Sequence, residues 1–277
     1  MRNRKEPPVH TGTDSFALSK WYADCLSDRG DTLIAYYGVA RWKRLVIRYS
    51  SLLTKMDDAP VCTQYSIKKD QEPLSEGSTV RWHSRHLGFE GIWTAIDRGY
   101  SATLFSSADG VVEWQCLQPR GVAEIRWRNG QRLSGLGYVE HLRMNVAPWK
   151  LPIEELSWGH FLNCTDSLVW IDWRGPYCTS LLLHNGRPIE GWEATDNRVS
   201  FATSGSLTLG DSAVLREGQL GVVALAALST VRKLLPHRIL AVNENKWRSR
   251  ARLNHPEPHD GWAIHEVVKW PRQPKPL

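Results

Sequence analysis

Two glutamates, Glu140 and Glu266, have neighbours that suit an acid catalyst. Each lies in a segment of alternating residues, 138–146 and 262–270, that is typical of a β-strand. Strand parity places each glutamate on a face with apolar and aromatic side chains. Loss of hydration there disfavours the charged carboxylate and raises its pKa. A neutral carboxylic acid in an apolar pocket can protonate an alkene and leave a carbocation for water or an internal nucleophile to trap.

The same two glutamates could instead be structural. A buried glutamate can accept hydrogen bonds from a tryptophan N–H or an arginine and hold a barrel closed. In either case we expect the two side chains to point into the apolar interiors of different halves of the chain. We therefore do not expect them to work as a paired acid and base.

Asp172 and His160 are further candidates for acid–base chemistry. Asp172 lies in segment 168–173, which is apolar on both faces, so it could hold a proton or orient a water. The alternative for Asp172 is to cap the turn at 174–176. His160 could shuttle a proton near neutral pH, or it could be a hydrogen-bonded core residue.

Aromatic side chains are the expected walls of a binding pocket. The chain has 14 tryptophans, and aromatic faces stabilise developing positive charge. We expect substrate contacts from Tyr138, Trp158, Trp173, Trp247 and Trp262.

Metal ions and other cofactors are not expected. The two closely spaced histidine pairs, His83 with His86 and His255 with His259, lack an evident third ligand, whereas a zinc site needs three or four ligands. The sequence also lacks a dinucleotide-binding glycine motif, a phosphate loop and a serine-hydrolase elbow.

Short segments of strand-forming residues dominate the chain and predict a mostly-β protein. Asn129-Gly130 between two such segments predicts a two-residue hairpin turn. Residues 219–235 are rich in alanine and leucine and precede Pro236, so they predict a single helix packed on the β structure. Strands are predicted at 32–38, 44–50, 79–83, 100–105, 111–117, 122–127, 168–173, 180–183, 198–202, 206–209, 239–243 and 263–270.

A repeated pattern indicates two similar halves. WYADCLSDRGDTLIAYYG runs from Trp21 to Gly38, and WGHFLNCTDSLVWIDWRG runs from Trp158 to Gly175 at the same spacing. GYVEH closes the first half and GWAIHE closes the second. We therefore expect two domains, 1–148 and 149–277, connected by the proline-containing segment 147–157.

These segments resemble the AttH-like group, which contains the carotenoid hydratases (hydroxyneurosporene synthases) and is akin to tocopherol cyclases and fungal double-barrel Diels–Alderases. The resemblance rests on WYADCLSDRGD, GYVEH, WGHF…LVWIDWRG and GWAIHEVVKW, and it spans roughly Phe16 to Trp270. It implies two lipocalin-like (calycin) barrels in tandem and a large apolar ligand, often an isoprenoid or polyene. Some members hydrate, cyclise or fold such substrates without a redox cofactor.

Charge and cysteine content limit the function classes further. The net charge is +6, but in 246–253 the basic residues alternate as on a strand with one solvated face. Nucleic-acid binding is therefore not expected.

Five cysteines without a Cys-x-x-Cys pair indicate a reducing compartment. Residues 1–15 lack a signal-peptide core and no apolar run would span a bilayer, so we expect a cytoplasmic protein, with peripheral membrane contact left open.

The favoured function is a cofactor-independent lyase or isomerase that hydrates, cyclises or isomerises an apolar polyene or isoprenoid in a Trp-rich pocket. A non-catalytic lipid or pigment carrier of the same fold is the alternative, and a partner-binding module with basic outer faces is a third reading. An acid on an apolar face favours catalysis, because a carrier of pure hydrocarbon does not need one.

Overall fold

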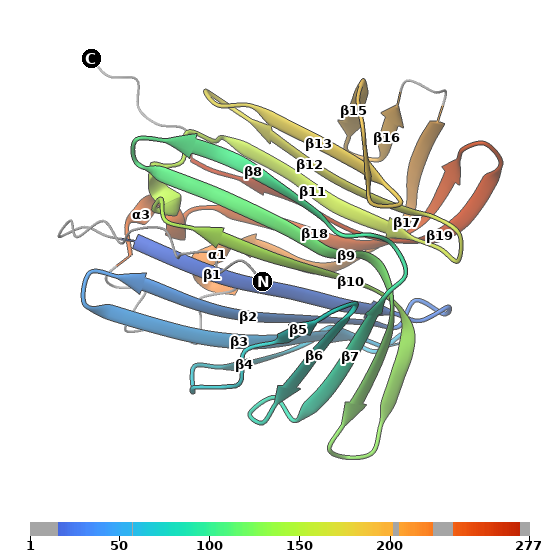
Figure 1. Cartoon of the computed structure of the whole chain (residues 1–277), viewed down its shortest axis with the longest axis horizontal. Helices are drawn as coiled ribbons and strands as arrows, with labels where there is room; N and C mark the ends of the chain where they lie inside the picture. The colour runs from blue at the N-terminus through green and yellow to red at the C-terminus, as the bar shows by residue number, and fades with distance from the viewer. Residues whose placement is uncertain (1–15, 57, 202–204, 224–234, 272–277) are drawn as a thin grey trace.

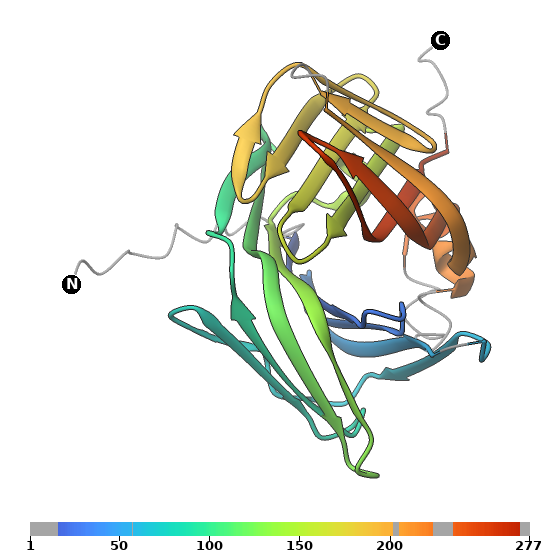
Figure 2. The ribbon, with the colours of Figure 1, turned by 90° about the vertical axis from the view of Figure 1, so that its right-hand side faces the viewer.

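The computed structural model describes residues 16–56, 58–201, 205–223 and 235–271. Within these ranges antiparallel strands dominate and form two sheets (Figure 1). Both sheets are strongly curved, and the second curls into a near-closed barrel (Figure 2). The mostly-β fold with two tandem barrel-like units is the one that the sequence predicted.

The first sheet is formed by residues 16–144. Its strands pair in the order β4-β3-β2-β1-β10-β9-β7-β6-β5, and β8 pairs with β9 outside this order. The strands are β1 (Phe16–Leu26), β2 (Thr32–Trp42), β3 (Leu45–Lys55), β4 (Cys62–Ser66), β5 (Leu74–Glu76), β6 (Thr79–Ser84), β7 (Phe89–Ala95), β8 (Tyr100–Ser107), β9 (Gly110–Trp127) and β10 (Arg132–Met144).

The second sheet, residues 155–269, repeats this topology. Its order, β14-β13-β12-β11-β19-β18-β17-β16-β15, matches the first position by position, and the described residues contain no counterpart of β8. The repeat predicted from the sequence is therefore present in the topology. The strands are β11 (Glu155–Leu162), β12 (Ser167–Arg174), β13 (Thr179–His184), β14 (Arg187–Ile189), β15 (Trp192–Thr195), β16 (Arg198–Phe201), β17 (Gly205–Gln219), β18 (Asn243–Asn254) and β19 (Pro258–Lys269).

The structural repeat is displaced by one residue from the sequence repeat. Trp21 packs inside the first sheet, whereas Trp158 belongs to the cluster between the sheets. By strand register the equivalent residues are Tyr22, opposite Glu140, and Trp158, opposite Glu266. The Trp-to-Gly spacing thus identified the repeated strands but not which of their faces correspond.

The core consists of three apolar clusters. One fills the curve of the first sheet and includes Trp82 and Trp93, and another fills the second sheet around Trp170. The third contains residues of both sheets, among them Tyr138 and Trp158, and so lies between them. Because successive side chains of a strand alternate, the central strands bury one face inside their own sheet and the other face against the neighbouring sheet.

The helical segments among the described residues are η1 (Pro148–Lys150), α1 (Leu220–Val223) and α3 (His237–Leu240). The helix predicted at 219–235 begins as α1, but 224–234 lie outside the described residues. The strand predicted at 239–243 is wrong, because α3 follows Pro236 and β18 starts only at Asn243. Proline favours the start of a helix, and one helical turn is too short to show a period.

The hairpin predicted at Asn129-Gly130 joins β9 to β10, but its turn is longer than two residues. The backbone N–H of Trp127 donates to the Gln131 carbonyl at 3.0 Å, and Gly130 has φ +88°. Glycine supplies this left-handed conformation without steric cost.

Candidate functional site

An aspartate and a histidine from different sheets meet in the interface. Asp24 lies on β1 and His160 on β11, and Asp24 Oδ2 is 2.6 Å from His160 Nε2. Both side chains are 0% exposed. Neither sheet holds this pair alone, so it forms only where the two halves pack together.

Several donors fix the Asp24 carboxylate. The Tyr22 hydroxyl donates to Oδ2 at 2.8 Å, and the backbone N–H of Tyr138 donates to Oδ1 at 2.9 Å. Burial, followed by the charge of Asp24, raises the pKa of Tyr22 well above its ordinary value, so Tyr22 stays a hydrogen-bond donor. Both carboxylate oxygens are therefore satisfied, as a buried polar group requires.

The environment of His160 leaves one ring nitrogen available. With Nε2–H directed at the carboxylate, a neutral imidazole carries its lone pair at Nδ1. Nδ1 is buried and has no hydrogen-bond partner among the described residues. The Tyr138 ring stacks on the imidazole, with centroids 4.6 Å apart and planes at 11°. The histidine is thus oriented by its neighbours and has a free acceptor that a substrate proton or a water could meet.

Glu140 is connected to this pair through Tyr138. Its Oε2 accepts hydrogen bonds from Tyr138 Oη at 2.7 Å and from Trp114 Nε1 at 2.6 Å. Burial, and then the charges of Cys116 and Glu140, raise the pKa of Tyr138 well above its ordinary value. Tyr138 therefore remains protonated and donates to Glu140 while its ring supports His160.

Glu266 lies on the opposite side of the interface in an ion pair with Lys246. Burial alone would raise the pKa of Glu266, but the Lys246 ammonium outweighs it and holds that pKa below its ordinary value. The expectation of a neutral acid therefore fails at Glu266, because the sequence did not reveal a buried lysine beside it.

The prediction that the basic face of β18 is solvated is wrong at Lys246. Lys246 is 2% exposed, whereas Arg250 and Arg252 further along the same face are exposed. Its Nζ donates to Tyr36 Oη at 2.9 Å and lies 5.1 Å from the Trp158 ring centroid. The start of β18 packs against the first sheet and its end does not, so one strand face is buried at one end only.

The other predicted site residues lie apart from the Asp24–His160 pair. Asp172 is paired with Arg174 at 2.7 Å, on a face of β12 that turns away from the interface. Trp173 packs in the interface cluster, and Trp247 stacks on His265 inside the second sheet. Among the predicted residues, His160 belongs to the pair itself, and Tyr138, Glu140 and Trp158 lie around it, with Glu266 beyond them.

Each sheet also holds a neutral histidine in its own interior. His141 Nε2 is 2.8 Å from Ser19 Oγ, and His265 Nε2 is 2.8 Å from Ser249 Oγ. Burial lowers the pKa of His141 to about 4, with Arg143 adding to the shift. Burial, then Lys246 and His160, lowers the pKa of His265 to about 4. These histidines do not contact Asp24 and serve as internal comparisons for His160.

A cleft of about 820 Å³ opens between the sheets at one end of the interface. Leu26, Leu162 and Trp262 are among its lining residues. Leu26 and Leu162 lie two residues beyond Asp24 and His160 on the same strand faces, so one layer of side chains separates the cleft from the pair. The volume suits a small organic ligand, for which pockets of roughly 300–1,000 Å³ are typical.

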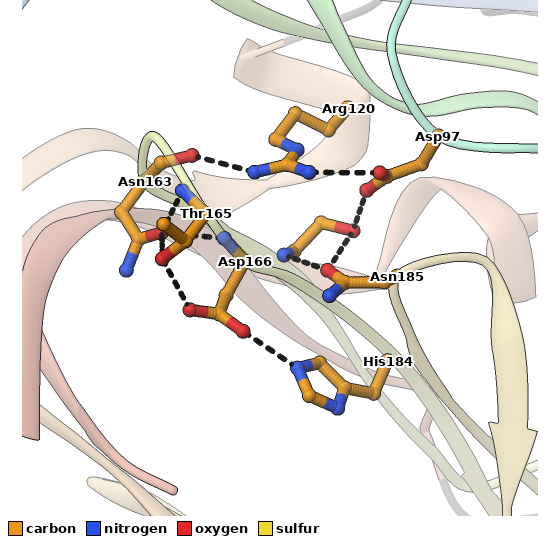
Figure 3. A network of polar contacts seen from close by, with 8 residues as sticks. Asp97, Arg120, Asn163, Thr165, Asp166, His184 and Asn185 are labelled. Atoms are coloured by element: carbon orange, nitrogen blue, oxygen red, sulfur yellow. Dashed lines mark hydrogen bonds and ion pairs between the residues drawn. The ribbon is translucent and has the colours of Figure 1, made fainter. Parts of the chain in front are cut away.

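A polar network beside the cleft attaches the β11–β12 turn to the first sheet (Figure 3). Arg120 Nη2 is 2.9 Å from Asp97 Oδ1, and Arg120 Nη1 donates to the Asn163 carbonyl at 3.3 Å. The Ser167 hydroxyl donates to Asp97 at 2.6 Å. Because Asn163 also lines the cleft, this network holds one edge of the cleft in position.

Two kinds of feature are absent from the described residues. Among them, no group of three or more histidine, cysteine or acidic residues has an arrangement that could hold a metal ion. None of the helices in that part of the chain has the length and apolar character to cross a membrane.

Comparison with known proteins shows a shared fold. No family model and no curated protein matches the sequence. An AttH protein from Nitrosomonas europaea matches with a TM-score of 0.54 at 11% identity, covering 94% of each chain. Kievitone hydratase from Nectria haematococca matches with a TM-score of 0.52 at 11% identity, covering 92% of this chain and 89% of that one. CghA, solved with Sch210972, matches at 0.54 and 9% identity, covering 92% and 88%.

Two residues of the interface between the sheets, Asp24 and Lys246, were not identified as site residues from the sequence. Asp24 stood in the motif WYADC without an assigned role, and Lys246 was assigned to solvent. Strand parity already placed Asp24 and Tyr22 on the same face of β1. The signal available in the sequence was an aspartate that shares a strand face with an aromatic residue.

Proposed function

We propose that the protein is a cofactor-independent enzyme that moves a proton on an apolar small molecule bound between its two sheets. The observation that carries the proposal is the buried Asp24–His160 pair, in which His160 Nδ1 has no partner within the part of the chain that the structure describes. A buried charge-bearing pair is costly unless it is well hydrogen-bonded, and perturbed, oriented pairs of this kind concentrate at functional sites. The fold, which is shared with a hydratase, supports this reaction class.

His160 acts as the general base and then as the general acid. Nδ1 takes a proton from a substrate carbon while Asp24 stabilises the imidazolium and holds its tautomer. The same proton returns either to another carbon, which isomerises the substrate, or to a departing hydroxyl, which leaves as water. Both outcomes balance without a further reactant, and the reverse of the second is a hydration.

The substrate class we propose is a polyene or isoprenoid. Its apolar body would occupy the cleft against Trp262, and its reacting end would displace Leu26 and Leu162 to reach His160. Glu140 acts here as a positioning residue, because its carboxylate holds Tyr138 against the His160 ring. The ion pair with Lys246 disfavours Glu266 as the proton donor.

A non-catalytic carrier of such a ligand is the second candidate. It is favoured by the complete burial of Asp24 and His160 and by the partners that occupy both glutamates. We also propose a reducing, cytoplasmic setting, since all five cysteines are free thiols.

The experiment begins with mass spectrometry of small molecules that co-purify with the protein from its own host. The ligand found is then incubated with the wild-type protein, with His160→Gln and with His265→Gln as a matched control. We expect His160→Gln to bind the ligand normally and to lose turnover by about 10²- to 10⁴-fold. The control should retain turnover, because His265 lies inside the second sheet. Ligand binding without any turnover by the wild type would establish the carrier, and full turnover by His160→Gln would exclude the base.

A further inference from the structure

We propose that the tip of the β2–β3 hairpin docks on a bilayer surface containing anionic lipid. The tip comprises residues 41–48 and projects at one end of the molecule, on the left in Figure 1. The inference goes beyond the proposed function and does not depend on it, because a carrier would use the surface equally.

Two adjacent large apolar side chains are exposed at this tip. Leu45 is 39% exposed and Val46 is 48% exposed. Single exposed apolar residues are ordinary on a protein surface, but adjacent ones on a projecting hairpin form an apolar edge. Because neighbours in a strand point to opposite faces, the two side chains flank the tip on both sides. Such an edge can enter the boundary between headgroups and acyl chains.

Basic residues surround the apolar edge. The 25 residues from Thr32 to Met56 contain five lysines and arginines and no aspartate or glutamate. Arg41 and Arg44 are exposed on either side of the turn. Anionic headgroups attract basic residues near a membrane surface, and the attraction falls off within a Debye length. Their charge therefore acts where the apolar side chains would insert.

Aromatic contacts support the base of the tip. The ring centroid of Trp42 lies 5.0 Å from that of Trp149 on η1, and Trp149 in turn contacts Phe16 at 5.6 Å. Lys43 Nζ lies 5.3 Å from the centre of the Trp42 ring. Tryptophan is favoured at membrane–water interfaces because one part of the ring system is apolar and the N–H is polar. The tip is thus held in position by side chains of the suitable type.

A second basic hairpin in the same chain allows the contribution of the basic residues to be distinguished from that of the exposed apolar residues. The β9–β10 turn carries exposed Arg128 and Arg132 but no exposed large apolar residue at its tip. A nucleic acid would need the cations and not the leucine and valine, so the β2–β3 tip favours lipid. The tip lies at the far end of β2, about 35 Å along the strand from the β1–β2 turn that lines the cleft. Docking would therefore leave the cleft uncovered.

The test is sedimentation of the full chain with vesicles of phosphatidylcholine alone or of phosphatidylcholine mixed with phosphatidylserine. We expect binding to the mixed vesicles only, weakened by added salt. Arg41→Ala and Arg44→Ala should each reduce the association constant about fivefold. Leu45→Ser with Val46→Ser should reduce it severalfold with little loss of fold, because both side chains are already exposed.

Matched controls are Arg128→Ala with Arg132→Ala for charge, and Val122→Ser, at a 46% exposed position on β9, for apolar exposure. These variants should bind the mixed vesicles like the wild type. An equal loss in the controls would show a nonspecific charge effect and overturn the docking surface. Absence of vesicle binding would also overturn it, as would capture of duplex DNA by Arg41 and Arg44 in its place.

Discussion

Glu140 and Glu266 occupy equivalent positions in the two sheets, each opposite an aromatic residue of the first strand of its sheet. Their neighbours across the next strand pair differ, since Glu140 lies opposite Cys116 and Glu266 lies opposite Lys246. Glu140 therefore accepts hydrogen bonds from neutral donors, whereas Glu266 is held as a charged carboxylate. The residue at one register position thus determines which kind of partner binds each of two topologically equivalent carboxyl groups.

Removing the ammonium of Lys246 should strongly destabilise the protein. In Lys246→Met the Glu266 and Glu244 carboxylates lose their shared buried cation, which we expect to cost about 3–5 kcal/mol of unfolding free energy. Denaturant unfolding of this variant, of Glu266→Gln and of the double variant measures the coupling. The double variant should lose less than the sum of the two single losses, and simple additivity would contradict the ion pair.

The Lys246–Glu266 pair should also set the pH dependence of stability at both extremes. The folded-state pKa of Glu266 is depressed, so its contribution is present above the ordinary glutamate pKa of about 4.3 and is lost as pH falls through the folded value. The folded-state pKa of Lys246 is raised, so its contribution is complete below about 10.4 and is lost as pH rises through the folded value. The stability gap between wild type and Glu266→Gln should therefore narrow in acid; a constant gap would refute the linkage.

His141 and His265 should make the fold sensitive to mild acid. Their folded-state pKa values are about 4, while an unfolded histidine titrates near 6.5. The unfolded chain therefore binds more protons in the window between these values, and stability must fall as pH decreases through it. Each histidine should contribute a loss on the order of 3 kcal/mol by the lower end of the window. Denaturant midpoints measured across it should show a smaller decline in His141→Gln than in the wild type.

Tyr138→Phe should separate two tasks of one side chain. The ring that stacks on His160 remains, as does the backbone N–H that binds Asp24, but Glu140 loses a donor. We expect a loss of about 1–3 kcal/mol in stability and a smaller loss of turnover than in His160→Gln. Tyr138→Leu removes the ring as well and should reduce turnover further; equal turnover in both variants would exclude a role for the stacked ring.

Gly159→Ala should destabilise the fold, although the substitution adds only a methyl group. A Cβ at position 159 would overlap the Trp170 indole, which lies against the glycine inside the second sheet. The strain should cost about 1–3 kcal/mol. Gly210→Ala is the control, because a methyl group at position 210 would have the Arg250 carbonyl oxygen, 3.8 Å away, as its nearest neighbour. Thermal unfolding should show a lower midpoint for the first variant only, and equal midpoints would contradict the packing.

Local patterns in the sequence were sufficient for many of the strands, the internal repeat and the sharing of strand faces, but they did not predict β4, β5, β7, β14 or β15. Alternation along 138–146 correctly grouped Tyr138 with Glu140, and alternation along 262–270 grouped Ile264 with Glu266. The prediction failed at 239–243, where a four-residue helix has no period to detect. The alternation of apolar and polar residues is a local property of the sequence, so it can be detected without knowing what packs against the strand.

Only the tertiary structure determined whether a given strand face packs inside its own sheet or against the neighbouring sheet. The central strands are buried on both sides, so parity could not say whether Glu140 and Glu266 enter two separate interiors or, as found, the common interface. The meeting of Asp24 with His160, 136 positions apart, and the burial of Lys246 beside Glu266 follow from how the two sheets pack. Burial and partner charges set pKa values, and both are properties of that packing rather than of the local sequence.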